Sequence, residues 1–202
     1  MSFIDHPAKA QARRGVLGSF TDYGSCFQNK SRKATVITNG CEASWATFEE
    51  PVLKQLRSGS KILAYDYDRH SYPTNKKTAP SGVVMINDDI FNNQEPFDAA
   101  WFDGFGALTA QLYRNIREQL RLARNNVAVP ISFSYIIQRS TMDIKGFILN
   151  LKQYVKNQLH RSLEEHSTTL HRGRNYPIRL AVIHMILNPD RKITWNHPNA
   201  IY

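Results

Sequence analysis

Apolar segments alternate with segments of helical periodicity along most of the chain. The apolar segments are rich in β-branched and aromatic residues and end in polar residues or glycine, which is typical of buried strands. They predict strands at residues 33–40, 61–68, 81–91, 97–104, 127–138 and 176–187. Spacing of three and four residues between apolar positions predicts helices at residues 41–59, 105–124 and 143–166. A turn at 188–190 and a short return strand at 191–196 follow.

The helix expected at residues 105–124 has the clearest pattern. Its apolar stripe comprises Leu108, Leu112, Ile116, Leu120 and Ala123. On the polar side, Arg114 and Glu118 are spaced as an i,i+4 ion pair. Pro51 interrupts the pattern at 41–59, so we expect a kink or two short helices there.

Strands that alternate with helices predict an α/β protein with a single doubly wound, mostly parallel sheet that is covered on both faces. The apolar runs VVMI, AAWF and LAVIHMIL are continuous, as in strands buried on both faces. A C-terminal antiparallel hairpin is the one departure from the alternation. We expect this fold over residues 33–202, preceded by a basic N-terminal segment, residues 1–32.

The charge balance favours a polyanionic partner. The 202 residues include 26 Lys and Arg but 17 Asp and Glu, a formal net charge of +9. Nucleic acid is the partner that such a balance suggests, and a merely basic surface is the alternative. There is no apolar run of about 18 residues, so no membrane span is expected. The segment MSFIDHPAKAQARRG lacks the apolar stretch of a secretory signal, and Cys26 and Cys41 are too few for a disulfide framework, so a reduced, cytoplasmic protein is expected.

Four consecutive predicted strands end in polar or acidic residues. These endings are Thr38-Asn39-Gly40, Asp66 with Asp68, Asn87-Asp88-Asp89, and Asp103-Gly104. In open α/β sheets, ligands bind outside the carboxyl ends of the strands, where carboxylates can accept hydrogen bonds from ribose hydroxyls or an adenine amino group. Gly40 and Gly104 would let the backbone come close to such a ligand. The alternative is that these acids form turns and helix N-caps.

Other common ligand motifs are weak or absent. The chain has no GxxxxGK[ST] phosphate loop. The segment GFGALT, residues 104–109, matches GxGxxG only in part, and no acid-ended strand follows about 20 residues later, as dinucleotide binding requires. The spacing of His160, His166 and His171 with the neighbouring glutamates fits no known ligand set, so no metal site is expected, and His184 lies in an apolar strand as a core residue would.

The order of elements over residues 33–196 resembles the class I, Rossmann-like, S-adenosylmethionine-dependent methyltransferases. The resemblance implies that Asn39, Gly40 and Glu42 lie in the loop that holds the methionine part of the cofactor. It implies that Asp66 or Asp68 binds the ribose and that Asp88 or Asp89 faces the adenine. Asp103 and Gly104 would line the methyl-transfer site, with Asp103 as the catalytic residue, and LNPDRKITW would form the hairpin.

The resemblance leaves two functions open. The first is an S-adenosylmethionine-dependent methyltransferase, with nucleic acid as the candidate substrate. The second is a non-catalytic nucleic-acid-binding protein on a degenerate Rossmann-like scaffold. The second is kept because the first loop, TNGCEASWATFE, has one glycine where the family is usually glycine-rich. No Asp-Pro-Pro-Tyr follows the fourth strand and no Pro-Cys motif is present, which argues against two known routes of DNA base methylation.

Overall fold

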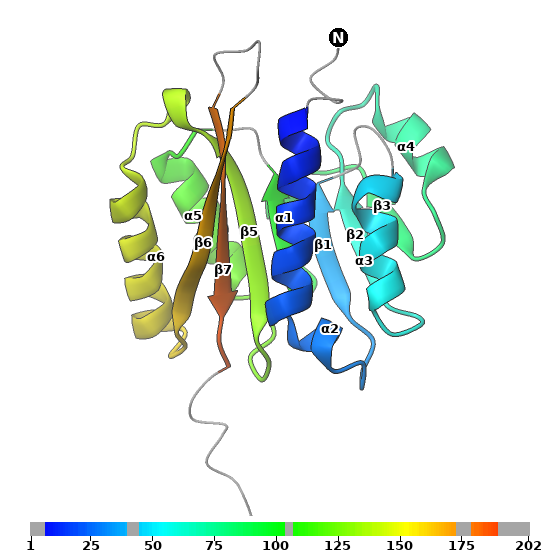
Figure 1. Ribbon diagram of the computed structural model, residues 1–202, viewed down its shortest axis with the longest axis horizontal. Helices are drawn as coiled ribbons and strands as arrows, with labels where there is room; N and C mark the ends of the chain where they lie inside the picture. Colours follow the sequence, from blue (N-terminus) through cyan, green and yellow to red (C-terminus); the bar gives the residue numbers. More distant parts are fainter. Residues whose placement is uncertain (1–6, 40–44, 104–106, 173–178, 190–202) are drawn as a thin grey trace, which may run out of the picture.

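The computed structural model describes residues 7–39, 45–103, 107–172 and 179–189. Within these ranges the strands form a seven-stranded sheet in the order β3-β2-β1-β4-β5-β7-β6 (Figure 1). The strands are β1 (Thr35–Asn39), β2 (Lys61–Tyr65), β3 (Val83–Ile86), β4 (Ala99–Asp103), β5 (Val129–Ile136), β6 (Leu163–Arg172) and β7 (Arg179–Leu187). Strands β1 to β5 pair in parallel, and β7 pairs antiparallel with both β5 and β6. The expected doubly wound, mostly parallel sheet is thereby confirmed.

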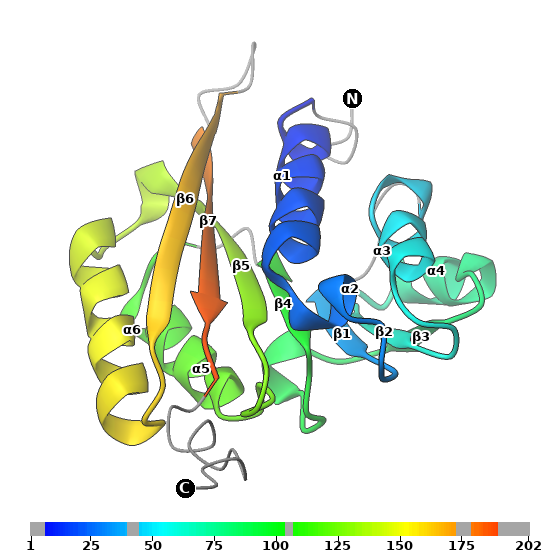
Figure 2. The same ribbon diagram turned by 60° about the horizontal axis from the view of Figure 1, so that its bottom comes forward.

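Helices cover both faces of this sheet (Figure 2). One face carries α1 (Pro7–Tyr23), α2 (Ser25–Gln28), α3 (Glu49–Gln55) and α4 (Tyr72–Thr78), and the other carries α5 (Ala110–Leu120) and α6 (Ile144–Gln158). Successive strand residues point to opposite faces, so Val36 packs under α1 and α3 while Ile37 packs under α5 and α6. None of the described helices is long and apolar enough to cross a membrane.

The basic N-terminal segment contributes a helix to the core. In α1, Ala12, Val16 and Phe20 follow one another at four-residue spacing and are at most 1% exposed. This spacing places them on one face, which packs against the sheet. The boundary that we drew at residue 32 stays a prediction, but the segment before it includes part of the hydrophobic core.

The C-terminal part differs from the sequence-based expectation. Helix α6 ends at Gln158, and residues 163–172, expected as helix and loop, form β6. His160 has a positive φ of 54°, a left-handed conformation in which a helix cannot continue. Strand β6 lies at the sheet edge, where exposed positions tolerate polar residues, and its sequence LEEHSTTLHR therefore resembled a polar helix. The antiparallel hairpin is thus formed by β6 and β7, and the return strand expected at 191–196 lies outside the described residues.

Two expected helices are shorter in the structure. The segment at 41–59 contains a short η2 (Trp45–Thr47) followed by α3, in line with the break that Pro51 predicted. Helix α5 begins after Thr109, whose Oγ1 accepts a hydrogen bond from the backbone N of Leu112 at 3.1 Å. The expected pair of Arg114 and Glu118 is wrong, because Glu118 lies 3.0 Å from Arg121 instead.

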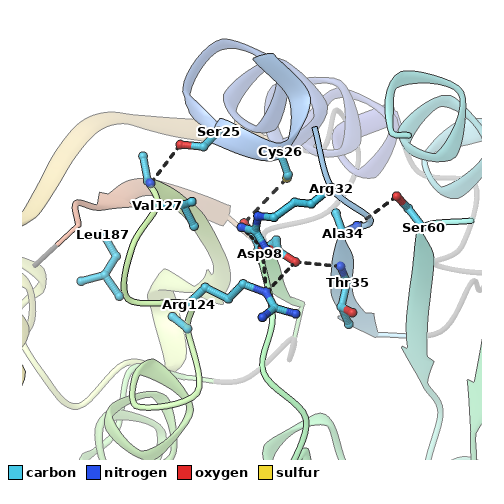
Figure 3. A network of polar contacts seen from close by, with 12 residues as sticks. Ser25, Cys26, Arg32, Ala34, Thr35, Ser60, Asp98, Arg124, Val127 and Leu187 are labelled. Atoms are coloured by element: carbon cyan, nitrogen blue, oxygen red, sulfur yellow. Dashed lines mark hydrogen bonds and ion pairs between the residues drawn. The ribbon is translucent and has the colours of Figure 1, made fainter. Parts of the chain in front are cut away.

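A buried carboxylate ties together the amino ends of β1 and β4 (Figure 3). The side chain of Asp98 is fully buried, and its Oδ2 accepts a hydrogen bond from the backbone N of Thr35 at 2.9 Å. Its Oδ1 lies 2.5 Å from Nη2 of Arg32 and 3.1 Å from Nε of Arg124. The backbone N of Asp98 also donates to the carbonyl oxygen of Thr35. Cys26 lies close by, and burial, followed by the charge of Asp98, raises the pKa of its thiol to about 12.

A buried arginine gathers the chain at the same edge of the sheet. Arg161, which is 3% exposed, precedes β6 and donates hydrogen bonds to carbonyl oxygens of two other segments. These acceptors are the carbonyl oxygens of Ala123, Val127, Leu187 and Asn188, at 2.6–3.2 Å. Arg161 therefore fixes the ends of β7 and of the α5–β5 connection against one another.

Replacing Asp98 by Asn should lower the free energy of unfolding by about 3 kcal/mol, because two guanidinium groups would lose their buried carboxylate. Glu95→Gln is the matched control, since the pair of Lys61 and Glu95 is 39% and 53% exposed and should contribute less than about 1 kcal/mol. Urea unfolding of both variants measures the difference. Equal, small losses in the two variants would contradict the central role of Asp98.

Candidate functional site

The ends of β1, β2, β3 and β4 place the predicted polar residues along one edge of the sheet. These four strands are parallel and adjacent in the order β3-β2-β1-β4, so their carboxyl ends meet at the same edge, which is the upper one in Figure 1. Asn39 and Asp103 are the last residues of β1 and β4, and Asp66 directly follows β2. Among the predicted site residues, Gly40, Glu42 and Gly104 lie outside the described residues.

A side-chain contact joins the ends of the two central strands. Oδ1 of Asn39 accepts a hydrogen bond from the backbone N of Asp103 at 2.8 Å. This contact uses the amide oxygen of Asn39 and fixes the point at which β4 ends. The side chain of Asp103 is partly buried at this position. Asn39 therefore positions the backbone of Asp103, the residue to which we assigned the catalytic role.

The carboxylate of Asp66 organises the loop that follows β2. Oδ1 of Asp66 accepts from the backbone N of Asp68 at 2.9 Å. Its Oδ2 accepts from Oγ of Ser71 at 2.8 Å and from Nδ2 of Asn75 at 3.0 Å. The carbonyl oxygen of Asp66 accepts from Nδ2 of Asn87, which joins the ends of β2 and β3. Both carboxylate oxygens of Asp66 are thus already used to hold the loop against α4.

Asp68, two residues further on, presents an exposed carboxylate. Its Oδ1 accepts a hydrogen bond from the backbone N of His70 at 2.9 Å. This hydrogen bond is the main reason that the pKa of Asp68 lies below its usual value. The side chain is ionised at neutral pH and can accept further hydrogen bonds from a ligand. Tyr67, between Asp66 and Asp68, is 74% exposed.

The loop after β3 holds the next two acids. Oδ1 of Asp88 accepts from the backbone N of Asp89 at 2.8 Å and from Nδ2 of Asn92 at 2.7 Å. Oδ1 of Asp89 accepts from the backbone N of Phe91 at 3.0 Å and so caps the short helix η3 (Ile90–Asn92). Both acids are exposed. They have the turn and capping roles that the alternative interpretation predicted, and their side chains still face solvent.

A buried polar network holds the backbone of this loop through hydrogen bonds, and the sequence analysis missed it. The hydroxyl of Tyr65 donates to Oδ1 of Asn93 at 2.8 Å, and Nε2 of Gln119 donates to the carbonyl oxygen of Phe91 at 2.9 Å. Burial raises the pKa of Tyr65 to about 12, so its hydroxyl stays a neutral donor. The ring of Phe91 stacks on that of Phe102 with centroids 5.4 Å apart. The only signal in the sequence was Asn93 within the polar segment that follows the third expected strand.

The arrangement collects negative charge at one edge of a protein whose net charge is +9. Asp66, Asp68, Asp88 and Asp89 all follow β2 or β3. Like charges repel one another, and hydrogen-bond donors of a ligand would stabilise these carboxylates. The site is therefore suited to a ligand that carries hydrogen-bond donors or positive charge.

Several solved structures resemble this one in fold. The magnesium protoporphyrin IX methyltransferase ChlM from Synechocystis PCC 6803, with bound SAM, has a TM-score of 0.60 at 11% identity, over 89% of this chain and 79% of its own. The N-methyltransferase NodS from Bradyrhizobium japonicum WM9 has a TM-score of 0.56 at 13% identity, over 92% and 98%. An rRNA methylase from Streptococcus thermophilus has a TM-score of 0.53 at 15% identity, over 87% and 96%.

This is the fold of the class I S-adenosylmethionine-dependent methyltransferases. The methyltransferase fold that the order of elements predicted is thereby confirmed, with β7 as the antiparallel strand inserted between β5 and β6. No protein-family model matches the sequence, and no curated protein matches it either. At identities of 11–15% the likeness establishes the fold alone.

A buried glutamate lies at the start of α3, near the carboxyl edge of the sheet. Glu49 begins α3, shortly after residues 40–44, and is 3% exposed. Burial raises its pKa to about 7, and the charge of Arg13, a buried residue of α1, opposes this rise only in part. Glu49 therefore changes its charge near neutral pH, which its position in the sequence did not reveal.

The buried carboxyl of Glu49 should make stability fall as pH rises. Its pKa is about 7 in the folded chain and about 4.5 normally, so both states hold the proton below pH 4.5. Between pH 4.5 and 7 the unfolded chain loses the proton first, and the folded state is destabilised by up to about 3 kcal/mol above pH 7. Glu49→Gln should flatten this decline and raise the free energy of unfolding at pH 8.

Urea unfolding at intervals from pH 4.5 to pH 8 measures this effect. Glu50→Gln removes one negative charge from the neighbouring, partly exposed position and controls for net charge. If Glu49→Gln and the wild type keep a constant difference across this range, the carboxyl does not titrate as inferred.

Proposed function

We propose that this protein is an S-adenosylmethionine-dependent methyltransferase. The observation that carries the proposal is the row of exposed acids at the carboxyl edge of a sheet with methyltransferase topology. The acids follow β2 and β3, and Asp103 ends β4, next to the central strand β1. These acids also form turns and a helix cap, and their exposed carboxylates still have oxygens available to a ligand.

The contacts assign different tasks to the two acids after β2. Both oxygens of Asp66 hold the loop, whereas Asp68 is exposed and ionised. We therefore assign the ribose hydroxyls to Asp68 and a positioning role to Asp66. Asp88 and Asp89, exposed after β3, would accept from the adenine amino group.

The remaining predicted residues would serve the methyl-transfer end of the site. Asn39 holds the backbone of Asp103. Gly40, Glu42 and Gly104 belong to the two loops that follow β1 and β4 and are proposed to adjoin the cofactor. S-adenosylmethionine would supply an activated methyl group on its sulfonium. Asp103 would orient the acceptor's N–H or O–H and take the proton that the acceptor loses when it forms its bond to the methyl carbon.

Nucleic acid is the acceptor class that we propose. The net charge of +9 favours a polyanion, and one of the similar solved structures is described as an rRNA methylase. The same charge also supports the second candidate, a non-catalytic nucleic-acid-binding protein in the cytoplasm. The two candidates differ in whether the chain binds the cofactor.

Titration calorimetry with S-adenosylmethionine and S-adenosylhomocysteine should show micromolar binding to the wild type. Asp68→Asn and Asp88→Asn should each weaken binding about tenfold or more, because each removes a charged acceptor from the site. Asp22→Asn is the control, an exposed acid at the end of α1. A well-folded protein that binds neither ligand would overturn the methyltransferase proposal and leave the non-catalytic candidate.

Asp103→Asn should abolish transfer of a labelled methyl group to RNA or DNA while cofactor affinity stays within about threefold. The backbone N of Asp103 keeps its bond to Asn39 in this variant, so the end of β4 should persist. Thermal unfolding checks this. A variant that unfolds at a much lower temperature would show that Asp103 is a structural residue, and a variant with normal transfer would show that it is not catalytic.

A further inference from the structure

Three arginines form a row along one side of α5. Arg114, Arg117 and Arg121 are spaced i, i+3 and i+7, which puts them on one stripe of the helix. At 1.5 Å per residue the row is about 10 Å long. We call these three residues the arginine row. Its side faces α6, because Arg117 and Arg121 both lie over the ring of Tyr154 in that helix.

Neutral groups hold most of the arginine row in place. The guanidinium carbon of Arg117 lies 4.2 Å from the ring centroid of Tyr154 and 5.5 Å from that of Tyr113. Nε of Arg121 donates to the hydroxyl of Tyr154 at 2.7 Å, and Nη2 of Arg114 donates to Oε1 of Gln111 at 2.7 Å. Aromatic rings and amides fix the side chains without cancelling their charge.

The charge of the row is also left largely uncompensated by its surroundings. Helix α5, helix α6 and the N-cap of α6 together contain two carboxylates. Glu118 lies 3.0 Å from Arg121, and Asp143 caps α6 by accepting from the backbone N of Gly146. Within the described chain, Nε of Arg117 is buried and has no hydrogen-bond partner. The rings of Tyr113 and Tyr154 lie against this guanidinium, so no carboxylate neutralises its charge.

The facing stripe of α6 is polar and uncharged. Asn150 and Asn157 are exposed and lie seven residues apart on one side of the helix. The hydroxyl of Tyr113 donates to the carbonyl oxygen of Asn150 at 3.2 Å, which places this stripe beside α5. Amide side chains can donate to phosphate oxygens and do not repel them.

We propose that the arginine row binds the phosphate backbone of a polynucleotide, which is the methyl acceptor. Guanidinium groups bind phosphate through paired hydrogen bonds, and a line of pre-positioned guanidinium groups suits a polymer of phosphates. Helix α5 follows β4 and its terminal Asp103 in the chain, so a strand bound along α5 leads toward the methyl-transfer end of the site. The identity of the acceptor rests on the proposed function, whereas phosphate binding by the row can be measured without cofactor.

The test compares two triple variants that lose the same charge. R114Q/R117Q/R121Q removes the arginine row, and K145Q/K152Q/K156Q removes three cations from the opposite, solvent-facing stripe of α6. Fluorescence anisotropy of a labelled 20-nucleotide single-stranded RNA and of the matching DNA, without cofactor, gives affinity against salt. Loss of the row should reduce the slope of log affinity against log salt by about 2, and loss of the α6 lysines by less than 1.

Arg114→Gln alone keeps the test valid if the triple variant unfolds, because Arg114 is exposed and its described partner is the side chain of Gln111. It should reduce the slope by about 0.7–0.9.

Equal slopes for the two triple variants, no salt-dependent binding of either nucleic acid, or equal competition by polyglutamate at the same charge concentration would each overturn the proposal. Calorimetry with S-adenosylmethionine separates the two proposals. A wild type that binds RNA through the row but binds no cofactor refutes the proposed function alone.

Discussion

The buried carboxylate of Asp98 is the contact on which the arrangement of the sheet depends. A fully buried carboxylate is several kcal/mol less stable than a hydrated one unless charged partners and hydrogen bonds compensate it. Arg32 comes from the segment before β1, Arg124 from the segment after α5, and the backbone N–H from Thr35 at the start of β1. The requirement for all three partners thus sets β1 beside β4, at the centre of the strand order from which the remaining strands extend.

Charged groups are treated in opposite ways at the two edges of the sheet. At the amino edge, Asp98 and Arg161 are buried, and their polar atoms contact fixed partners from several segments. At the carboxyl edge, Asp68 and Asp88 use one oxygen within their loops and remain exposed. The first pattern stabilises the chain, whereas the second leaves hydrogen-bonding capacity toward solvent. This contrast is the physical reason to propose ligand binding at the carboxyl edge and to assign a stabilising role to the charged residues of the amino edge.

Sequence patterns predicted the parts of the structure that rest on local, repeated signals. Continuous apolar runs located β1 to β5 and β7, and the acids at strand ends came together because parallel strands share an edge. The edge strand β6 was missed because its polar composition matches a solvated helix, and only its pairing with β7 stabilises it. Asp98 was missed as a structural anchor, since nothing local distinguishes a carboxylate that meets arginines from distant segments. The division of tasks between Asp66 and Asp68 likewise depends on partners that spacing does not reveal.

The separation of charge across the molecule links the arginine row to the site. Asp66 and Asp68 follow β2, whereas the arginine row lies on α5, which packs with α6 under β4, β5 and their neighbours. In the proposals made above, a polyanion would be repelled by Asp68 and attracted to the arginine row, so it would approach from the side of β4 and leave the β2 side to the nucleoside of the cofactor. Asp103 ends β4, the strand that lies between these two regions in the sheet. In the two proposals taken together, this charge distribution would bring the acceptor and the activated methyl group together at Asp103.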